Sequence, residues 1–258
     1  SQGKPLAANV DWQKIAKRTI GFSGADIENM LNEAAIAAAR RQRKTIEMAD
    51  LEEAALKVKL GPEKKLKQSA NDLKMTAYHE AGHAVATYFL PKMDPVHRIS
   101  IVSRGGSLGH TLIPPQADRY TETKSHLLAQ ITSLLGGRSA EKLIFKELTG
   151  GAASDISRAT EIARTMVVKM GMSDLGPINF GPGTEIDALG PAWYEPEQLS
   201  EAMRAKVDGE IKKIMDKCLS QAEGLLLKHK DKLDAVAEAL LKKETLEAED
   251  FKTIMEKK

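Results

Sequence analysis

The residues best suited to chemistry in this sequence are His79, Glu80 and His83, which form a His-Glu-x-x-His motif. Two histidines four residues apart stand on one face of a helix and can occupy neighbouring corners of a tetrahedral zinc site. Glu80 projects about 60° around the helix axis from His83, so it can reach a water on the metal without being a ligand. In that position it can take a proton from the zinc-bound water as that water attacks a peptide bond. The motif therefore predicts a zinc endopeptidase of the His-Glu-x-x-His type.

A short motif of this kind also occurs by chance in helices that carry no metal. Here it lies in an apolar segment, residues 76–89, with several alanines and a valine around the histidines. Ionisable side chains are costly in apolar surroundings unless they are paired or bound to a metal. This context favours the metal site over a chance match.

A catalytic zinc site needs a third protein ligand, and the motif supplies only two. The longer version of the motif, with Gly and His three and six residues further on, is absent, because Ala86 and Phe89 stand there. The candidates elsewhere are His97, His110, His126, Glu141, Asp155 and Glu161. Asp155 follows a Gly-rich stretch and opens a predicted helix, where a carboxylate also serves the helix N-terminus. The residues alone leave this choice open.

The helix that carries the motif must end before Pro91. Gly82 inside it costs about 1 kcal/mol relative to Ala, which predicts that another backbone packs closely there. Residues 99–102 and 111–113 are short β-prone runs around a Gly-Gly turn. Such a sheet can bind a peptide along its edge through main-chain hydrogen bonds, or it can be a plain structural hairpin. The sequence pattern favours neither the peptide-binding edge nor the structural hairpin.

The remainder of the chain after the motif is predicted to be helical. Apolar residues recur at helical spacing over residues 127–135, 138–145, 156–167, 199–225, 233–241 and 246–255. Residues 171–196 are rich in Gly and Pro and predict an irregular loop. Cys218 lies on an apolar stripe and is predicted to be a core residue, not a nucleophile.

Residues 1–63 predict a small helical module without a catalytic constellation. Its first helix carries Trp12 and Ile15, and Ser23 with Asp26 forms a capping box that opens the second. The buried stripe of that second helix is predicted to comprise Ile27, Met30, Leu31, Ala34, Ala35 and Ala38. The basic run 40–44 predicts a solvated helix end, with phosphate binding as the alternative. A third helix is expected over residues 48–58. A Gly-Pro step and a charged run then predict a joint, which separates domains at 1–63 and 64–258.

Composition narrows the remaining possibilities. The 258 residues carry 38 basic and 36 acidic side chains, a net charge of +2, which gives no case for nucleic acid or a membrane surface. The single cysteine cannot form an internal disulfide, so a reducing compartment is expected. No apolar run reaches about 18 residues, so no transmembrane helix or signal peptide is expected. The first five residues look like a cut inside a longer protein.

Residues 20–35 resemble the lid subdomain of AAA+ ATPases. In that family a Gly-Ala pair at the start of this helix lies against the bound nucleotide, which implies such a role for Gly24 and Ala25 in the intact protein. The chain has no Gly-x-x-x-x-Gly-Lys-Ser/Thr loop. It therefore cannot hold ATP phosphates by that route, which argues against an independent nucleotide-hydrolysing domain.

Two motifs, His79-Glu80-Ala81-Gly82-His83 and residues 149–155 (TGGAASD), resemble the FtsH family of ATP-dependent zinc metalloproteases. Residues 96–101 and 135–141 also match. The resemblance implies that Asp155 is the third zinc ligand, beside His79 and His83. Ser154 departs from the Asn that is common before this aspartate, but either residue can hydrogen-bond locally.

The resemblance also implies the architecture and the setting of the protein. The fold is expected to be mainly α with a small β-sheet, a helical AAA+ lid subdomain followed by a helical zinc metallopeptidase domain. The expected cofactors are Zn²⁺ here and ATP with Mg²⁺ only in the intact protein. Unfolded or misfolded polypeptides are the expected substrates, within a homo-hexamer that does not bind nucleic acid.

The intact protein is expected to be anchored in the bacterial inner membrane through an absent N-terminal segment, with this part cytoplasmic and soluble. The rival hypothesis is a non-catalytic assembly module with a structural metal. A structural zinc site has four protein ligands and no open position, so Glu80 beside the ligands argues for the enzyme.

Overall fold

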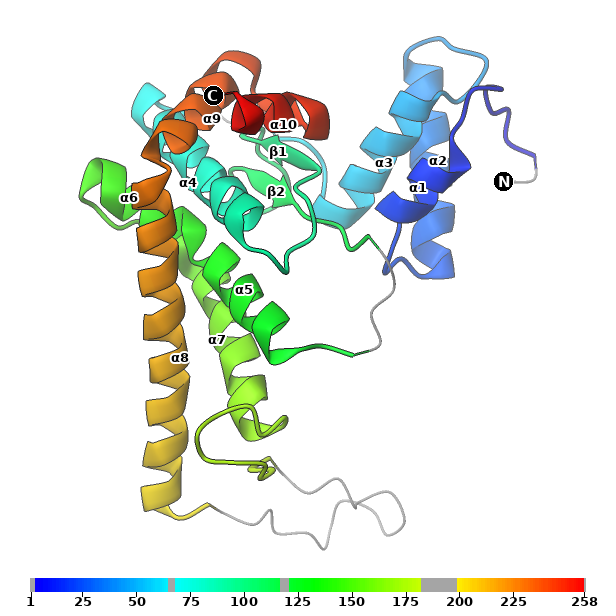
Figure 1. Cartoon of the computed structure of the whole chain (residues 1–258). Coiled ribbons are helices and arrows are strands. Elements are labelled where there is room, and N and C mark those ends of the chain that lie inside the picture. The colour runs from blue at the N-terminus through cyan, green and yellow to red at the C-terminus, as the bar shows by residue number, and fades with distance from the viewer. Residues whose placement is uncertain (1–2, 65–67, 117–120, 182–198, 258) are drawn as a thin grey trace, which may run out of the picture. The chain divides into compact units, whose positions relative to one another are not determined.

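The computed structural model describes residues 3–64, 68–116, 121–181 and 199–257. Helices dominate these described residues, and three short strands among them form one antiparallel sheet in the order β2–β1–β3 (Figure 1). The expected fold class, mainly α with a small sheet, is confirmed. No helix among these residues is both long enough and apolar enough to cross a lipid bilayer.

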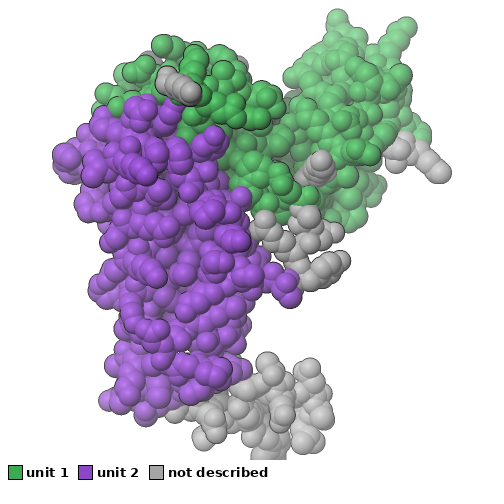
Figure 2. All heavy atoms as spheres, viewed as in Figure 1, with its two compact units in different colours: residues 1–80, 94–118, 234–258 green, residues 81–93, 119–233 purple. Residues whose placement is uncertain are grey.

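The chain forms two compact units, which Figure 2 shows in different colours. The first comprises residues 1–80, 94–118 and 234–258, and the second comprises residues 81–93 and 119–233. Helices α4 (Ala70–Phe89) and α9 (Lys230–Lys243) each contribute residues to both. The domain boundary expected after residue 63 stays a prediction.

The first three helices are α1 (Trp12–Arg18), α2 (Gly24–Arg40) and α3 (Met48–Leu60). The predicted capping box is present, because the Ser23 hydroxyl accepts the Asp26 N–H while the Asp26 carboxylate accepts the Ser23 N–H. The buried cluster of this region is Ile15, Met30, Leu31, Ala34, Ala38, Ile46, Leu51, Ala54 and Ala55. Ile27 was expected on the buried stripe, but it is 40% exposed because it lies in the first turn of α2, outside the packed positions.

Two arginines of the basic run after α2 contact a buried carboxylate. The carboxylate of Asp50 accepts hydrogen bonds from Arg41 at 2.7 Å and from Arg43 at 3.0 Å. Asp50 also accepts the Glu47 N–H and so caps the start of α3. Two residues of the run therefore pair with a buried carboxylate. The sequence had suggested a solvated helix end or phosphate binding, and neither hypothesis included this pairing.

The sheet consists of β1 (Arg98–Ser100), β2 (His110–Leu112) and β3 (Thr245–Glu247). Ile99 is opposite Thr111 on one side and opposite Leu246 on the other. The two short strands predicted around the Gly-Gly turn are confirmed, and they pair with each other. The prediction that Leu246 begins the last helix is wrong, because β3 precedes α10 (Ala248–Glu256). Leu246 is apolar and fully buried, and its pairing with a distant strand leaves no signal in local spacing.

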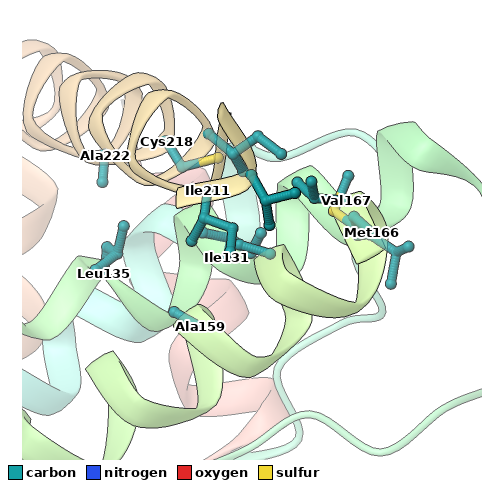
Figure 3. Packing of buried hydrophobic residues seen from close by; sticks show 12 residues of the cluster. Ile131, Leu135, Ala159, Met166, Val167, Ile211, Cys218 and Ala222 are labelled. Carbon is teal, nitrogen blue, oxygen red and sulfur yellow. The ribbon is translucent and has the colours of Figure 1, made fainter. Parts of the chain in front are cut away.

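The second unit contains α5 (Lys124–Leu134), α6 (Gly136–Phe145), the 3-10 turn η1 (Gly150–Ala152), α7 (Ala153–Val168) and α8 (Glu201–Lys228). Helices α5, α7 and α8 pack around one apolar cluster, which Figure 3 shows from close by. Its buried members are Leu127, Ile131, Leu135, Ala159, Ala163, Met166, Val167, Val207, Ile211, Ile214, Cys218 and Ala222.

The predicted stripe of α8 is confirmed from Val207 to Ala222. At its ends the prediction is wrong: Leu199 precedes the helix, Met203 is only partly buried, and the last buried position is Leu226 and not Leu225. Cys218 lies inside the cluster as predicted, and burial raises the pKa of its thiol. A thiol in such surroundings is a core group. Of the predicted loop 171–196, residues 182–196 lie outside the described part of the chain, and residues 171–181 form no helix or strand.

Candidate metal centre

The His-Glu-x-x-His motif lies on helix α4, as its spacing predicts. Glu80 is 6% exposed and His83 is 8% exposed. The apolar residues of this helix that surround them are fully or almost fully buried: Ala77, Tyr78, Ala81, Ala84, Val85 and Ala86. Ionisable groups in such a setting require partners or a metal.

Asp155 lies in the first turn of α7, and its Oδ2 is 3.4 Å from His83 Nε2. His79, His83 and Asp155 each offer one ligand atom, and these three atoms lie within 4.8 Å of one another. Within the described ranges this is the one group of three or more His, Cys, Asp or Glu side chains that can hold a metal ion. The structure thus brings Asp155 close to two histidines that lie far earlier in the sequence.

The donor set fits zinc. Zinc bonds of about 2.0–2.2 Å in tetrahedral geometry place two ligand atoms about 3.3–3.6 Å apart. The 3.4 Å between His83 Nε2 and Asp155 Oδ2 falls in this range. Two imidazoles and one carboxylate also match catalytic zinc sites, in which three protein ligands leave a fourth position open.

A hydrogen bond to a main-chain carbonyl sets the tautomer of His83. Its Nδ1 lies 2.9 Å from the Ser133 carbonyl oxygen in α5. A carbonyl can only accept, so Nδ1 carries the proton and Nε2 keeps its lone pair for a metal. Thr87 supports the arrangement, because its hydroxyl donates to the His83 carbonyl at 2.7 Å and accepts from the Ser133 hydroxyl at 2.6 Å.

Two glycines let α4 and α6 approach closely. A Cβ on Gly82 would lie 2.5 Å from the Gly136 carbonyl oxygen, and a Cβ on Gly136 would lie 2.6 Å from the Gly82 carbonyl oxygen. The predicted close packing of a second backbone at Gly82 is confirmed. Because Gly82 directly precedes His83, this crossing fixes the helix at the point where it presents a ligand.

The turn that leads to Asp155 is held by Glu141, which was itself a candidate ligand. Glu141 is 2% exposed, and its carboxylate accepts from the Thr149 N–H and the Thr149 hydroxyl, each at 3.1 Å. The Thr149 hydroxyl in turn accepts the Gly151 N–H and so caps η1. Glu141 therefore orders the Gly-rich segment ahead of α7.

The other candidate ligands lie outside the cluster. His126 pairs with Glu122, and Glu161 is exposed on α7. His97 is half-buried, and that burial lowers its pKa. His110 is buried in β2, where desolvation first and then the nearby charges of Arg104 and Arg98 lower its pKa to about 4.

Gly24 and Ala25, the residues expected beside a nucleotide, open helix α2. Among the residues that the structure describes, no further atom lies within 4 Å of the position of a Cβ on Gly24. Their role beside a nucleotide stays a prediction.

Glu80 has a partner that the sequence did not reveal. The Thr111 hydroxyl in β2 lies 2.7 Å from Glu80 Oε2 and 3.2 Å from the Glu80 carbonyl oxygen. Gly109, two residues earlier, faces the same carboxylate, since a Cβ there would lie 2.8 Å from Glu80 Oε1. A glycine beside a short strand is the one sequence signal that points to such a close approach.

A helix-borne His-Glu-x-x-His motif with a carboxylate as third ligand defines the class of zinc-dependent peptidases. Comparison with known families agrees. A model described as Peptidase family M41 matches residues 66–254, and a model of the AAA+ lid domain matches residues 9–53. The chain belongs to Peptidase family M41.

The relatives carry names that confirm the resemblance to the FtsH family. ATP-dependent zinc metalloprotease FtsH 1 of Thermoanaerobacter sp. (strain X514) is 47% identical over 256 residues, which cover 98% of this chain and 42% of that protein. ATP-dependent zinc metalloprotease FtsH of Pseudothermotoga lettingae is 48% identical over 258 residues, which cover 99% of this chain and 41% of that protein. ATP-dependent zinc metalloprotease FtsH of Thermotoga maritima is 46% identical over 258 residues, which cover 99% of this chain and 42% of that protein. The chain thus spans about two-fifths of the length of these relatives.

Proposed function

We propose that this chain is the zinc endopeptidase part of an ATP-dependent protease. The observation that carries the proposal is the group of three ligand atoms within 4.8 Å of one another, with the buried carboxylate of Glu80 on the same helix as two of them. The family and the names of the relatives support the same activity.

In this proposal His79, His83 and Asp155 hold one zinc ion. Zinc bound there supplies Lewis acidity, which polarises a peptide carbonyl and lowers the pKa of a bound water. Glu80 is the general base: its carboxylate accepts a proton from the attacking water and then delivers it to the nitrogen of the leaving amine. The Ser133 carbonyl keeps the Nδ1 proton on His83 throughout, so Nε2 remains a ligand atom.

Unfolded polypeptides are the substrate class that the sheet supports. In the described part of the chain, β2 pairs with β1 on one side only and is an edge of the sheet. An extended peptide can add to such an edge through main-chain hydrogen bonds, which depend little on its side chains. Since Thr111 of β2 contacts Glu80, a peptide on this strand has its scissile bond within reach of the general base.

The setting of the intact protein belongs to the same proposal. The match of residues 9–53 to an AAA+ lid supports a boundary after residue 63 and a motor that uses ATP with Mg²⁺. In the intact protein Gly24 and Ala25 lie beside the nucleotide. The assembly is a homo-hexamer that degrades unfolded or misfolded proteins, anchored in the bacterial inner membrane by a segment outside this chain, with this part on the cytoplasmic side.

The rival function is a module whose metal only stabilises an assembly. A structural zinc site uses four protein ligands. The cluster found among the described residues has three, and a buried glutamate follows the first of them. Hydrolysis therefore explains more of the site than a structural role does.

The test is a casein-degradation assay on the zinc-loaded chain, with zinc measured by atomic absorption. Glu80→Gln keeps all three ligands but cannot accept the proton, so we expect full zinc content and a rate lower by about 10²–10⁴-fold. Glu161→Gln, on the exposed side of α7, is the matched control and should cleave like the wild type. A wild-type rate in Glu80→Gln would overturn the proposal.

A further inference from the structure

Strand β2 contributes a second feature of the site, which rests on the function proposed above. We propose that Thr111 is a positioning residue for proton transfer: its hydroxyl holds the Glu80 carboxylate in place, and Gly109 provides the space that the carboxylate occupies. Both residues come from one short segment of the chain, and both meet the same side chain.

The hydrogen bond from Thr111 has a defined direction. The hydroxyl has one proton and lies near two acceptors, Glu80 Oε2 at 2.7 Å and the Glu80 carbonyl oxygen at 3.2 Å. A hydrogen bond from a hydroxyl to a carboxylate is stronger than one to a neutral carbonyl oxygen, so the proton of Thr111 lies toward Oε2. It occupies one of about four lone-pair positions of the carboxylate.

Gly109 is needed for the carboxylate to lie there. Gly109 directly precedes β2 and lies two residues before Thr111. A Cβ on residue 109 would lie 2.8 Å from both Glu80 Cγ and Glu80 Oε1, and also 2.8 Å from the Ser100 carbonyl oxygen. Contacts that short do not occur, so any side chain at this position displaces Glu80 or the strand.

The backbone of β2 makes Thr111 a rigid anchor. Its neighbours His110 and Leu112 pair with Ser100 and Arg98 across the antiparallel ladder, so the strand cannot shift relative to β1. Threonine is β-branched and restricted at χ1, whereas glutamate has three rotatable side-chain bonds. A stiff donor thus selects one arrangement of a flexible general base. Misplacing a reacting group by about 1 Å can cost about 100-fold in rate.

The test compares Thr111→Val, which is isosteric and lacks the hydroxyl, with Thr111→Ser, which keeps it. We expect Thr111→Val to keep its zinc and its KM while kcat falls about 10- to 100-fold, and Thr111→Ser to recover most of the rate. Thr111→Ala removes the hydroxyl without placing a methyl group against the carboxylate, and it should show the same loss. A wild-type kcat in both Thr111→Val and Thr111→Ala would overturn the proposal.

Thr245→Val is the matched control. Thr245 lies in β3 of the same sheet, and its hydroxyl bonds to the Ser100 hydroxyl at 2.8 Å instead of the site. Its loss should leave kcat unchanged. A similar fall of kcat in this control would mean that any lost hydroxyl in the sheet slows the enzyme, which would also overturn the role given to Thr111.

Crystal structures of metal-free wild type and Thr111→Val provide a readout that does not depend on activity. We expect the Glu80 carboxylate to leave its wild-type position in the variant, and an unmoved carboxylate would contradict the proposal. Gly109→Ala should displace the same group, while Gly106→Ala, where no atom lies within 4 Å of the new Cβ, should not. If the wild type cleaves nothing, the proposed function fails, while the position of the carboxylate still decides the role of Thr111.

Discussion

Two buried carboxylates, Asp50 in the lid-like helices and Glu80 on α4, are held in different ways. Asp50 is 0% exposed and accepts from two arginines and a main-chain N–H. Glu80 is nearly as buried, and the hydroxyl of Thr111 donates to it. The described partners of Asp50 include two charged guanidinium groups, and those of Glu80 include a neutral hydroxyl.

The difference separates a carboxylate that stabilises the fold from one to which we assign a role in chemistry. Charged partners pair with a carboxylate and make it a fixed part of the structure. A hydroxyl orients the group without adding a positive charge beside it. Burial alone therefore does not identify a catalytic acid or base.

Glycines show the same contrast between the two regions. Gly24, at the start of α2, has open space where a Cβ would stand. Gly82, within α4, has the Gly136 backbone at 2.5 Å from that position. The space beside Gly24 is available to something outside the chain, whereas the space beside Gly82 is filled by the chain itself.

The largest effect is expected when a ligand is removed. Asp155→Ala should lose zinc and all measurable casein cleavage, because two histidines do not complete a catalytic site. Its thermal midpoint without metal should stay close to that of the metal-free wild type, as befits a residue that serves chemistry. Glu161→Ala, two turns further along α7 and exposed, should keep both zinc and activity. Zinc retained in Asp155→Ala would show that another residue is the third ligand.

The opposite result is expected for Asp50→Asn. Removing its charge leaves Arg41 and Arg43 without their buried counterion, at a cost of about 2 kcal/mol once the partial exposure of both arginines is considered. Urea denaturation should show this loss, while kcat of the folded protein and its zinc content stay unchanged. A fall in kcat at full zinc content and below the unfolding transition would contradict this prediction, because it would show that Asp50 also affects catalysis.

The smallest effect, none at all, is expected from ATP. The 258 residues contain no phosphate-binding Gly-x-x-x-x-Gly-Lys-Ser/Thr loop, and phosphoryl transfer depends on such a part. The chain should hydrolyse no ATP and should cleave casein slowly at the same rate with or without it, whereas a stably folded protein should survive. Gly24→Ala should change none of these rates. Stimulation of cleavage by ATP would contradict this prediction and would give residues 1–63 a role in the cleavage reaction of this chain.

Much of the local structure was predictable because it depends on neighbours in the sequence. The capping box of Ser23 and Asp26 spans three residues, and the stripe that buries Cys218 follows the helical period. Strand β3 was missed because its partner Ile99 is far away in the sequence. A short apolar run has no periodicity long enough to separate strand from helix.

The sequence by itself determined the half of the site that lies within one helix. The spacing of His79, Glu80 and His83 places two imidazoles and a carboxylate side by side wherever that helix packs. Asp155 stood among several candidates until family resemblance singled it out, because the residues alone do not say which distant group approaches His83.

Only the tertiary structure decided how these groups are oriented. The Ser133 carbonyl reaches His83 across 50 residues of sequence, and the Thr111 hydroxyl reaches Glu80 across 31. Neither contact follows from a local pattern, since each depends on the packing of separate elements. The physical reason is range: helical spacing acts over a few bonds of the backbone, whereas a hydrogen bond between elements exists only after the apolar surfaces of those elements have packed together.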